Sequence, residues 1–93
     1  MASQTSGKVS EVGFKFTAEP GSNVFVAGTF NHWDPAQYKL RENAKKGVFA
    51  TSLTLPTGEH EYKFVVNGVW CVDPHCAVAV PNAHGTHNSV LWI

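Results

Sequence analysis

The feature that most limits the fold of this chain is a repeated alternation of apolar and polar residues with a period of two. From Val12 to Ala18 the apolar residues stand at every second position, and a similar alternation runs from Phe49 to Leu55. This is the pattern of a strand with one buried face. Glycine, proline and asparagine separate such segments at short, regular intervals. We expect strands at residues 12–18, 24–28, 49–55, 62–66, 69–72 and 89–93.

Short strands with turn residues between them are typical of an all-β, antiparallel, immunoglobulin-like sandwich, here of about 6–8 strands. A length of 93 residues allows one domain, and its 43% hydrophobic content can supply the core. We expect a flexible N-terminal tail over residues 1–10 and a single module over residues 11–93. Residues 37–42 could add one helical turn.

The charge balance excludes several classes of protein. Seven basic residues offset seven acidic ones, and the formal net charge is +0. Without a basic patch, we expect no nucleic-acid partner. Without a long apolar or basic amphipathic segment, we expect no membrane partner. The first eight residues are small and polar, unlike a signal peptide, so a cytoplasmic location is expected.

Asn67-Gly68 is the strongest local signal in the sequence. This pair suits a two-residue type I′ turn, which would place Val66 opposite Val69 and Val65 opposite Trp70. Alternation then puts two sets of side chains on opposite faces. The expected core face carries Tyr62, Phe64, Val66, Val69 and Cys71, and the outer face carries Lys63, Val65, Trp70 and Val72.

A tryptophan and a lysine side by side on an outer face are suited to a sugar. A flat indole matches the apolar C–H face of a pyranose ring, and a lysine can donate hydrogen bonds to hydroxyl groups. The alternative is that Trp70 packs beneath a loop or against another domain. Spacing alone does not separate these two interpretations.

Several motifs in order resemble the family 48 carbohydrate-binding modules, and above all the glycogen-binding domain of AMP-activated protein kinase β subunits. The resemblance covers nearly the whole chain, from Val12 to Ile93. The motifs that carry it are VFVAGTFNHW at residues 24–33, LPTGEHEYKF at 55–64, VNGVW at 66–70, Asp73-Pro74, and GTHNSVL at 85–91.

The resemblance implies non-catalytic binding of α-1,4-linked glucans such as glycogen, starch or malto-oligosaccharides. In the kinase-type modules two tryptophans hold the glucan, together with a lysine, a threonine, an asparagine and a leucine. By motif position the first five correspond to Trp33, Trp70, Lys63, Thr86 and Asn88. His84 stands where the family has its leucine, and a histidine can still stack on a sugar or hydrogen-bond to it.

The resemblance also implies that the module holds an attached or associated glycogen- or starch-metabolising enzyme, or a kinase, on the polymer. It implies no cofactor. The alternative is a structural or protein-interaction module of the same fold that binds no sugar. Trp92 bears on that alternative, because it points outward if Leu91 and Ile93 point inward. It would then mark a contact with another domain or cap the edge of the sandwich.

The sequence also bears on metal binding and on catalysis. Cys71, Cys76, His84 and His87 could in principle close a tetrahedral zinc site. Their C-x4-C-x7-H-x2-H spacing is not that of a common zinc module, and the hairpin register turns Cys71 into the core, so we predict no metal site. Hydrolysis of a glycoside needs two carboxylates facing the sugar, and the sequence offers no such pair, so we expect no enzyme.

Overall fold

The computed structural model describes residues 8–43 and 46–93, and within them it is an antiparallel β-sandwich. This confirms the expected all-β fold. The smaller sheet has the order β1-β5-β4 and contains β1 (Val9–Thr17), β5 (Val48–Pro56) and β4 (Arg41–Glu42). The larger sheet has the order β3-β2-β6-β9-β8, with β7 paired to β6 beside this path. Its strands are β3 (Tyr38–Lys39), β2 (Val24–Gly28), β6 (Glu59–Val66), β9 (His87–Trp92), β8 (Ala79–Pro81) and β7 (Val69–Cys71).

All six expected strands are present, and three short ones were missed. Residues 37–42 form no helical turn, because Tyr38–Lys39 pairs with β2 and Arg41–Glu42 pairs with β5. β8 lies at the edge of its sheet, where its Pro81 removes no needed hydrogen bond. Residues 1–7 of the expected tail lie outside the described residues, and β1 begins at Val9, two residues before the expected boundary.

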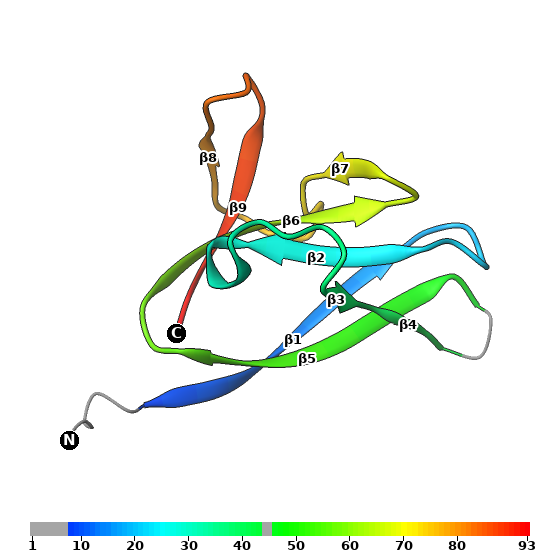
Figure 1. Ribbon diagram of the computed structural model, residues 1–93, viewed down its shortest axis with the longest axis horizontal. Coiled ribbons are helices and arrows are strands. Elements are labelled where there is room, and N and C mark those ends of the chain that lie inside the picture. The colour runs from blue at the N-terminus through cyan, green and yellow to red at the C-terminus, as the bar shows by residue number, and fades with distance from the viewer. Residues whose placement is uncertain (1–7, 44–45) are drawn as a thin grey trace.

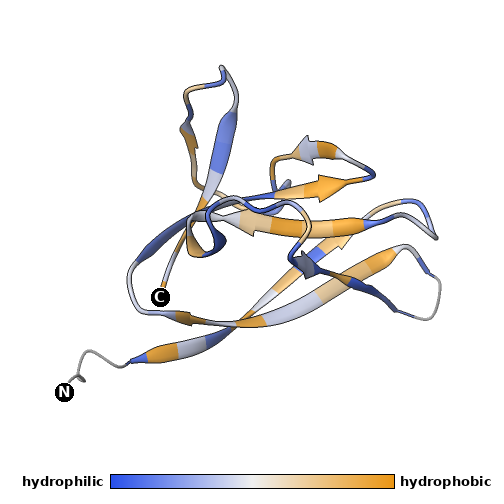
Figure 2. Ribbon diagram, viewed as in Figure 1, coloured by the Kyte–Doolittle hydropathy of each residue, from blue (hydrophilic) through white to orange (hydrophobic). Residues whose placement is uncertain are grey.

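The core lies between the two sheets. Phe14 of β1 and Phe49 of β5 are buried against Val24, Tyr62 and Phe64 of the larger sheet. The ring centroids of Phe14 and Tyr62 are 5.1 Å apart in an edge-to-face arrangement. Figure 1 shows β1 and β5 running beneath β2 and β6, and Figure 2 shows hydrophobic residues along β2 and along the second half of β6.

The β6–β7 hairpin has the expected register, with Val66 opposite Val69, Val65 opposite Trp70, and Phe64 opposite Cys71. Asn67 and Gly68 both have positive φ angles, as a type I′ turn requires. The expected core face is wrong at one position, because Val69 is 62% exposed. β7 pairs only with β6 (Figure 1), so its outer end has no opposing sheet to bury it.

One edge of β6 is shared by two strands, and this arrangement creates the candidate site. β9 pairs with the first half of β6, ending at Ser89 opposite Tyr62. β7 pairs with the second half, beginning with Cys71 opposite Phe64. Lys63 lies between these two ladders. Beyond Ser89, β9 leaves β6 and pairs only with β8, so the β8–β9 hairpin rises above the sheet beside β7 (Figure 1).

Candidate functional site

A groove of about 670 Å³ lies between β7, the β8–β9 hairpin and the loop that follows β2. All six side chains singled out from the sequence line it. They are Trp33, Lys63, Trp70, His84, Thr86 and Asn88. Four more residues of the lining were not singled out: Thr29, Glu61, Asn82 and Ala83. The groove therefore gathers residues from four separate stretches of the chain.

The first wall of the groove is Trp70, which stands on regular secondary structure. It lies in the middle of β7, directly opposite Val65 of β6. Val65 is buried, whereas Trp70 remains 42% exposed. The hairpin register therefore fixes which way the indole points, and one face of the ring stays accessible.

The second wall is Trp33, which stands on an irregular loop. The chain leaves β2 at Gly28 and makes a short 3-10 helix, η2 (Thr29–Asn31). His32 and Trp33 then follow with φ angles of 56° and 60°. Non-glycine residues occupy this left-handed region at a cost, and such strain gathers at functional sites.

Asn31 holds this loop from inside. Its side chain is only 6% exposed. The Oδ1 atom accepts a hydrogen bond from the backbone N–H of Gly28 at 3.0 Å, and the Nδ2 atom donates to the carbonyl of Asp34 at 3.1 Å. At Gly28 a Cβ atom would collide with the carbonyl oxygen of Glu61, so only glycine fits there. The loop thus depends on two residues that do not themselves line the groove.

The two indoles lie close together and are inclined to each other. Their ring centroids are 6.4 Å apart and their planes make an angle of 50°. Two inclined aromatic faces form a concave apolar surface, which differs from the flat stack of a simple aromatic pair. This surface matches a ligand whose apolar faces turn along its length.

The floor of the groove is polar and largely buried. Lys63 is 8% exposed and Asn88 is 7% exposed. The ammonium group of Lys63 donates a hydrogen bond to Oγ1 of Thr86 at 3.1 Å. The expectation of an open outer face is therefore wrong at Lys63 and Val65, which are both buried. The contact with Thr86 shows that the β8–β9 hairpin reaches Lys63 on that face. The lysine stem is covered, and its charged end reaches the groove.

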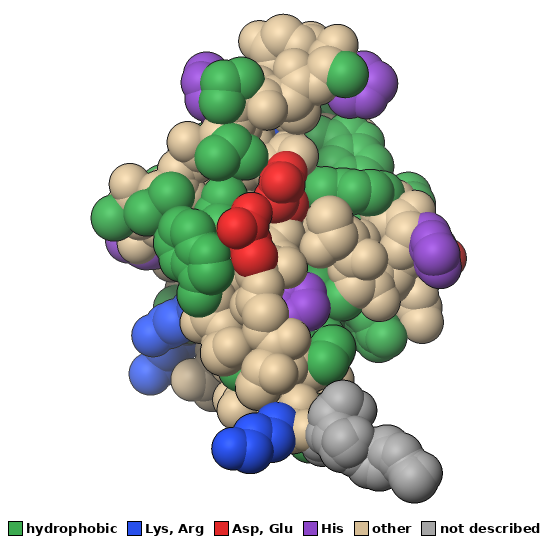
Figure 3. All heavy atoms as spheres, turned by 90° about the vertical axis from the view of Figure 1, so that its left-hand side faces the viewer, with side chains coloured by type: hydrophobic (Ala, Val, Ile, Leu, Met, Phe, Trp, Pro, Cys, Tyr) green, Lys and Arg blue, Asp and Glu red, His purple; other side chains and the backbone are tan. Residues whose placement is uncertain are grey.

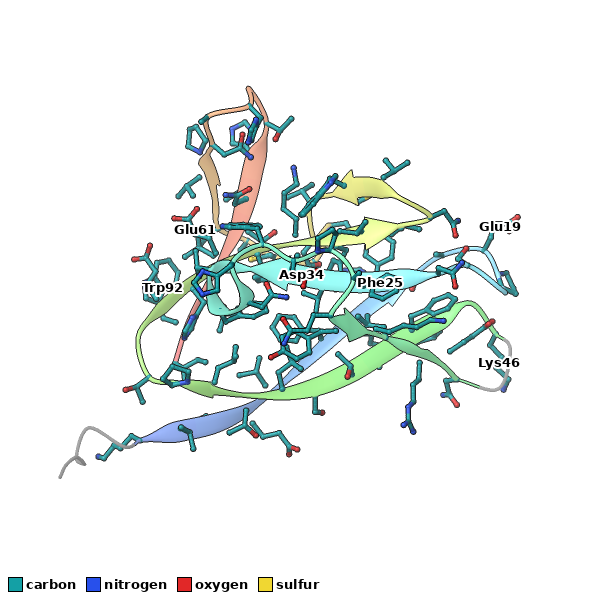
Figure 4. All side chains as sticks on the ribbon, in the orientation of Figure 1. Glu19, Phe25, Asp34, Lys46, Glu61 and Trp92 are labelled. Atoms are coloured by element: carbon teal, nitrogen blue, oxygen red, sulfur yellow. The ribbon has the colours of Figure 1, made fainter. Side chains whose placement is uncertain are left out.

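The residues that the sequence interpretation missed left weak signals. Glu61 is two positions before Lys63, so alternation along the strand places it on the same face. Asn82 follows Pro81 and belongs to a turn, where asparagine commonly hydrogen-bonds to nearby backbone groups. Figure 4 shows Glu61 and Trp92 on the same side of the molecule, and Figure 3 views that side face-on. Acidic side chains there lie among hydrophobic ones.

The four residues of the zinc alternative are not assembled. Among the residues that the structure describes, no group of three or more histidine, cysteine or acidic side chains is arranged to hold a metal ion. Cys76 lies close to the carbonyl oxygens of Val78 and Val90, at 3.3 Å from each. Cys71 is partly buried, and both cysteines are free thiols.

A buried tyrosine anchors the segment that follows β7. The hydroxyl of Tyr62 donates a 2.6 Å hydrogen bond to Oδ2 of Asp73, and the backbone N–H of Asp73 donates to Oγ of Ser89. Burial raises the pKa of Tyr62 far above its ordinary value, and the hydrogen bond and negative charge of Asp73 raise it further. These contacts tie the chain after Trp70 to β6 and β9.

The comparisons with known proteins agree with this geometry. A family model described as the glycogen recognition site of AMP-activated protein kinase matches residues 11–93. The chain belongs to this family. It is 38% identical over 73 residues to the pig 5′-AMP-activated protein kinase subunit beta-1, covering 78% of this chain and 56% of that one. It is also 38% identical over 76 residues to the human subunit beta-2, covering 82% of this chain and 26% of that one.

This glycogen-recognition chain spans between about a quarter and just over half of the length of these curated relatives. The shared part is therefore the module itself. In the described residues, no helix is long and apolar enough to cross a membrane.

Proposed function

We propose that the groove binds α-1,4-linked glucans through stacking of glucose units on Trp33 and Trp70. The observation that carries this proposal is the pair of inclined indoles, 6.4 Å apart, above a polar floor. An α-1,4-glucan curves, so successive pyranose faces turn relative to one another and each indole can cover a different unit. Lys63, Thr86 and Asn88 then hydrogen-bond to the sugar hydroxyls.

His84 has a separate part in this proposal. It is exposed at the tip of the β8–β9 hairpin and lines the groove near its rim. An imidazole can stack on a pyranose or exchange a hydrogen bond with a hydroxyl, so it replaces the apolar contact that a leucine would make. The affinity for a single oligosaccharide should lie at roughly tens of micromolar to millimolar, because the site is shallow and wet. Several such contacts along a branched polymer would raise the apparent affinity.

The role we assign to the groove is binding without catalysis. Glu61 is the only carboxylate among the described residues that line it, and its Oε1 accepts a 3.0 Å hydrogen bond from Nδ2 of Asn88. Glycoside hydrolysis requires a second carboxylate roughly 5–10 Å away across the sugar. The module would instead hold an attached or associated enzyme or kinase on glycogen or starch. The cytoplasmic location remains a prediction.

A structural module without sugar binding is the competing candidate, and one observation favours it. Trp92 is 60% exposed on β9, outside the groove, with its indole N–H donating to Oε1 of Glu59 at 3.3 Å. An exposed tryptophan of this kind suits a protein contact. Leu91 and Ile93 pack against the core, so the expected outward direction of Trp92 is confirmed, but its partner remains a hypothesis.

A calorimetric titration with maltoheptaose separates the two candidates. The wild-type chain should bind it saturably and should not bind a cello-oligosaccharide of equal length. Trp70→Ala should weaken binding by about 10- to 100-fold, because stacking of one ring contributes on the order of 1–3 kcal/mol. Trp92→Ala is the matched control, since it also removes an exposed indole, and it should bind as the wild type does. Absence of heat with maltoheptaose and with glycogen would exclude the glucan proposal.

A further inference from the structure

A continuous chain of side-chain hydrogen bonds runs beneath the groove. Asn88 donates through Nδ2 to Oε1 of Glu61 at 3.0 Å, and its Oδ1 accepts from Nδ2 of Asn82 at 2.9 Å. The same Nδ2 of Asn82 donates to Oγ1 of Thr86 at 2.8 Å. Thr86 also accepts from the ammonium of Lys63 at 3.1 Å. Figure 4 labels Glu61, the acidic end of this chain, near the base of the β8–β9 hairpin.

The hydrogen bonds from Asn82 to Asn88 and from Asn88 to Glu61 run in one donor-to-acceptor direction, and Glu61 fixes that direction. An ionised carboxylate only accepts hydrogen bonds, so the amide of Asn88 must turn its Nδ2 towards Glu61. The Oδ1 atom of Asn88 then faces Asn82, so Asn82 must donate to it through Nδ2. Reversing the amide of Asn88 would bring two acceptors together at Glu61 and two donors together at Asn82. Asn88 is only 7% exposed, so water cannot readily replace the lost hydrogen bonds and the unpaired groups are costly.

This direction determines what the floor offers to a ligand. Thr86 receives two hydrogen bonds at Oγ1, from Asn82 and from Lys63, so its own O–H hydrogen is left to point elsewhere. Thr86 is exposed on the groove, and the open direction for that hydrogen is the groove itself. Only one of the three N–H donors of Lys63 is needed for Thr86. The floor at Lys63 and Thr86 therefore presents donors to the oxygens of a sugar.

The two polar side-chain atoms of Asn82 make different contacts: Oδ1 binds the hairpin loop, and Nδ2 binds Thr86 and Asn88. Its Oδ1 accepts from the backbone N–H groups of His84 and Thr86, at 2.9 and 3.2 Å, and so closes the loop at the tip of the hairpin. Its backbone N–H donates to the carbonyl of Thr86. Of the polar atoms of Asn82, only Nδ2 takes part in the side-chain hydrogen-bond network beneath the groove. An aspartate at this position would keep the loop contacts, remove the donor and add one negative charge.

We infer that Glu61 and Asn82 are positioning residues of the glucan site, which fix the hydrogen-bond direction of Asn88 and Thr86 without stacking on the sugar. This inference rests on the proposed function. It adds the expectation that the two residues are coupled to each other through Asn88. A residue that only stabilised the hairpin would show no such coupling.

The test is a double-mutant cycle with maltoheptaose titrations of Asn82→Asp, Glu61→Gln and the double variant. Asn82→Asp should weaken binding by about 10-fold, because Asn88 is left between two carboxylates and Thr86 loses one of its two donors. Glu61→Gln should bind within about threefold of the wild type, because a glutamine Oε1 still accepts from Asn88. The double variant should bind at least about threefold more tightly than Asn82→Asp, since Asn88 can now reverse between the new partners.

Charge and folding are controlled separately. Asn23→Asp adds the same negative charge at an exposed site outside the groove and should leave binding unchanged. Thermal unfolding of each variant establishes that the module remains folded. If Glu61→Gln weakens the Asn82→Asp variant further, or if Asn82→Asp binds like the wild type, the inference is wrong.

Side-chain amide NMR of the free protein tests the direction without any sugar. In the wild type, the Nδ2 hydrogens of Asn88 should show nuclear Overhauser contacts to the side chain of Glu61, and those of Asn82 to Thr86. The opposite pattern at Asn88 would overturn the inference even if no variant folds. A wild-type chain that shows the expected pattern but binds no maltoheptaose would contradict the proposed function and leave the hydrogen-bond direction intact.

Discussion

Trp33 and Trp70 line the same groove, and the backbone holds each of them in a different way. Trp70 lies in a ladder of regular pairs, opposite Val65, next to a two-residue turn. Trp33 lies in a loop where two consecutive residues have positive φ angles and one buried asparagine closes the backbone. The first arrangement rests on three cross-strand pairs between β6 and β7. The second rests on the side chain of Asn31 and on two backbone hydrogen bonds, from the N–H of Trp33 to the carbonyl of Gly28 and from the N–H of Asp34 to the carbonyl of Asn31.

This difference predicts unequal sensitivity to substitution. A strand keeps its register when one contact is lost, because the remaining pairs still define it. A loop held in a strained conformation relaxes when the side-chain contacts that fix it are removed. We therefore expect substitutions outside the groove to displace Trp33 more readily than Trp70.

Among substitutions outside the groove, the largest effects are expected at Asn31, first from Asn31→Ala. This change leaves the N–H of Gly28 and the carbonyl of Asp34 without their side-chain partner, which should lower the free energy of unfolding by roughly 1–3 kcal/mol. Trp33 would lose its fixed position, and affinity for maltoheptaose should fall by about 10-fold. Urea unfolding and calorimetric titration of the same samples measure both effects.

Asn31→Asp is the matched control for that variant. It retains an acceptor for the N–H of Gly28 but places a buried carboxylate oxygen against the carbonyl of Asp34, so its loss of stability should be at least as large as that of Asn31→Ala. If Asn31→Ala lowered stability and left the affinity at the wild-type value, Trp33 would not depend on this loop.

A smaller effect is expected on the Trp70 side from Asn67→Gly. Glycine accepts the φ angle of 51° at this position but cannot replace the Oδ1 acceptor for the N–H of Asn23. Unfolding free energy should fall by about 0.5–1.5 kcal/mol, and affinity should change less than about twofold, because the pairing of Val65 with Trp70 remains. A loss of affinity as large as that of Asn31→Ala would show that the turn, and not the ladder, holds Trp70.

The same contrast explains what the sequence could predict. The hairpin register follows from Asn67-Gly68 and strict alternation, so Trp70 and Lys63 could be placed together from spacing alone. Trp33 could be assigned only through the family resemblance, because no period or turn rule predicts two left-handed residues after a 3-10 helix. The short strands at 38–39, 41–42 and 79–81 were missed because two or three residues carry no measurable period.

Burial in the groove was also beyond the reach of alternation. The pattern assigns each side chain a face but does not say what covers it. Lys63 and Val65 were expected on an open face and are buried, and Lys63 contacts Thr86 on a hairpin distant in sequence. Val69 was expected in the core and is exposed, on a strand that pairs only with β6. Asn82 and Glu61 act through such distant contacts, which a single sequence does not encode locally.

An effect as small as that of Asn67→Gly is expected from Tyr62→Phe, which probes the anchor of the segment after Trp70. The substitution keeps the ring in the core and removes the hydrogen bond to Asp73. At pH 8 the unfolding free energy should fall by about 0.5–1.5 kcal/mol, and binding should change less than about twofold, because β7 still pairs with β6. A larger loss of affinity would mean that this anchor, in addition to the ladder, positions Trp70.

Alkaline pH sharpens this last comparison. The folded chain keeps the phenol proton of Tyr62 because burial and Asp73 raise its pKa, whereas the unfolded chain releases it above about pH 10. The raised folded pKa therefore contributes stability that is fully present below pH 10 and is lost as the pH rises towards the folded pKa. All other titratable groups are the same in both proteins, so the difference between wild type and Tyr62→Phe isolates Tyr62. That difference should shrink by up to about 1.4 kcal/mol per pH unit above pH 10 in urea unfolding. If the unfolding free energies of the two proteins differ by the same amount from pH 8 to pH 11, Tyr62 releases its proton as easily in the folded chain as in the unfolded one.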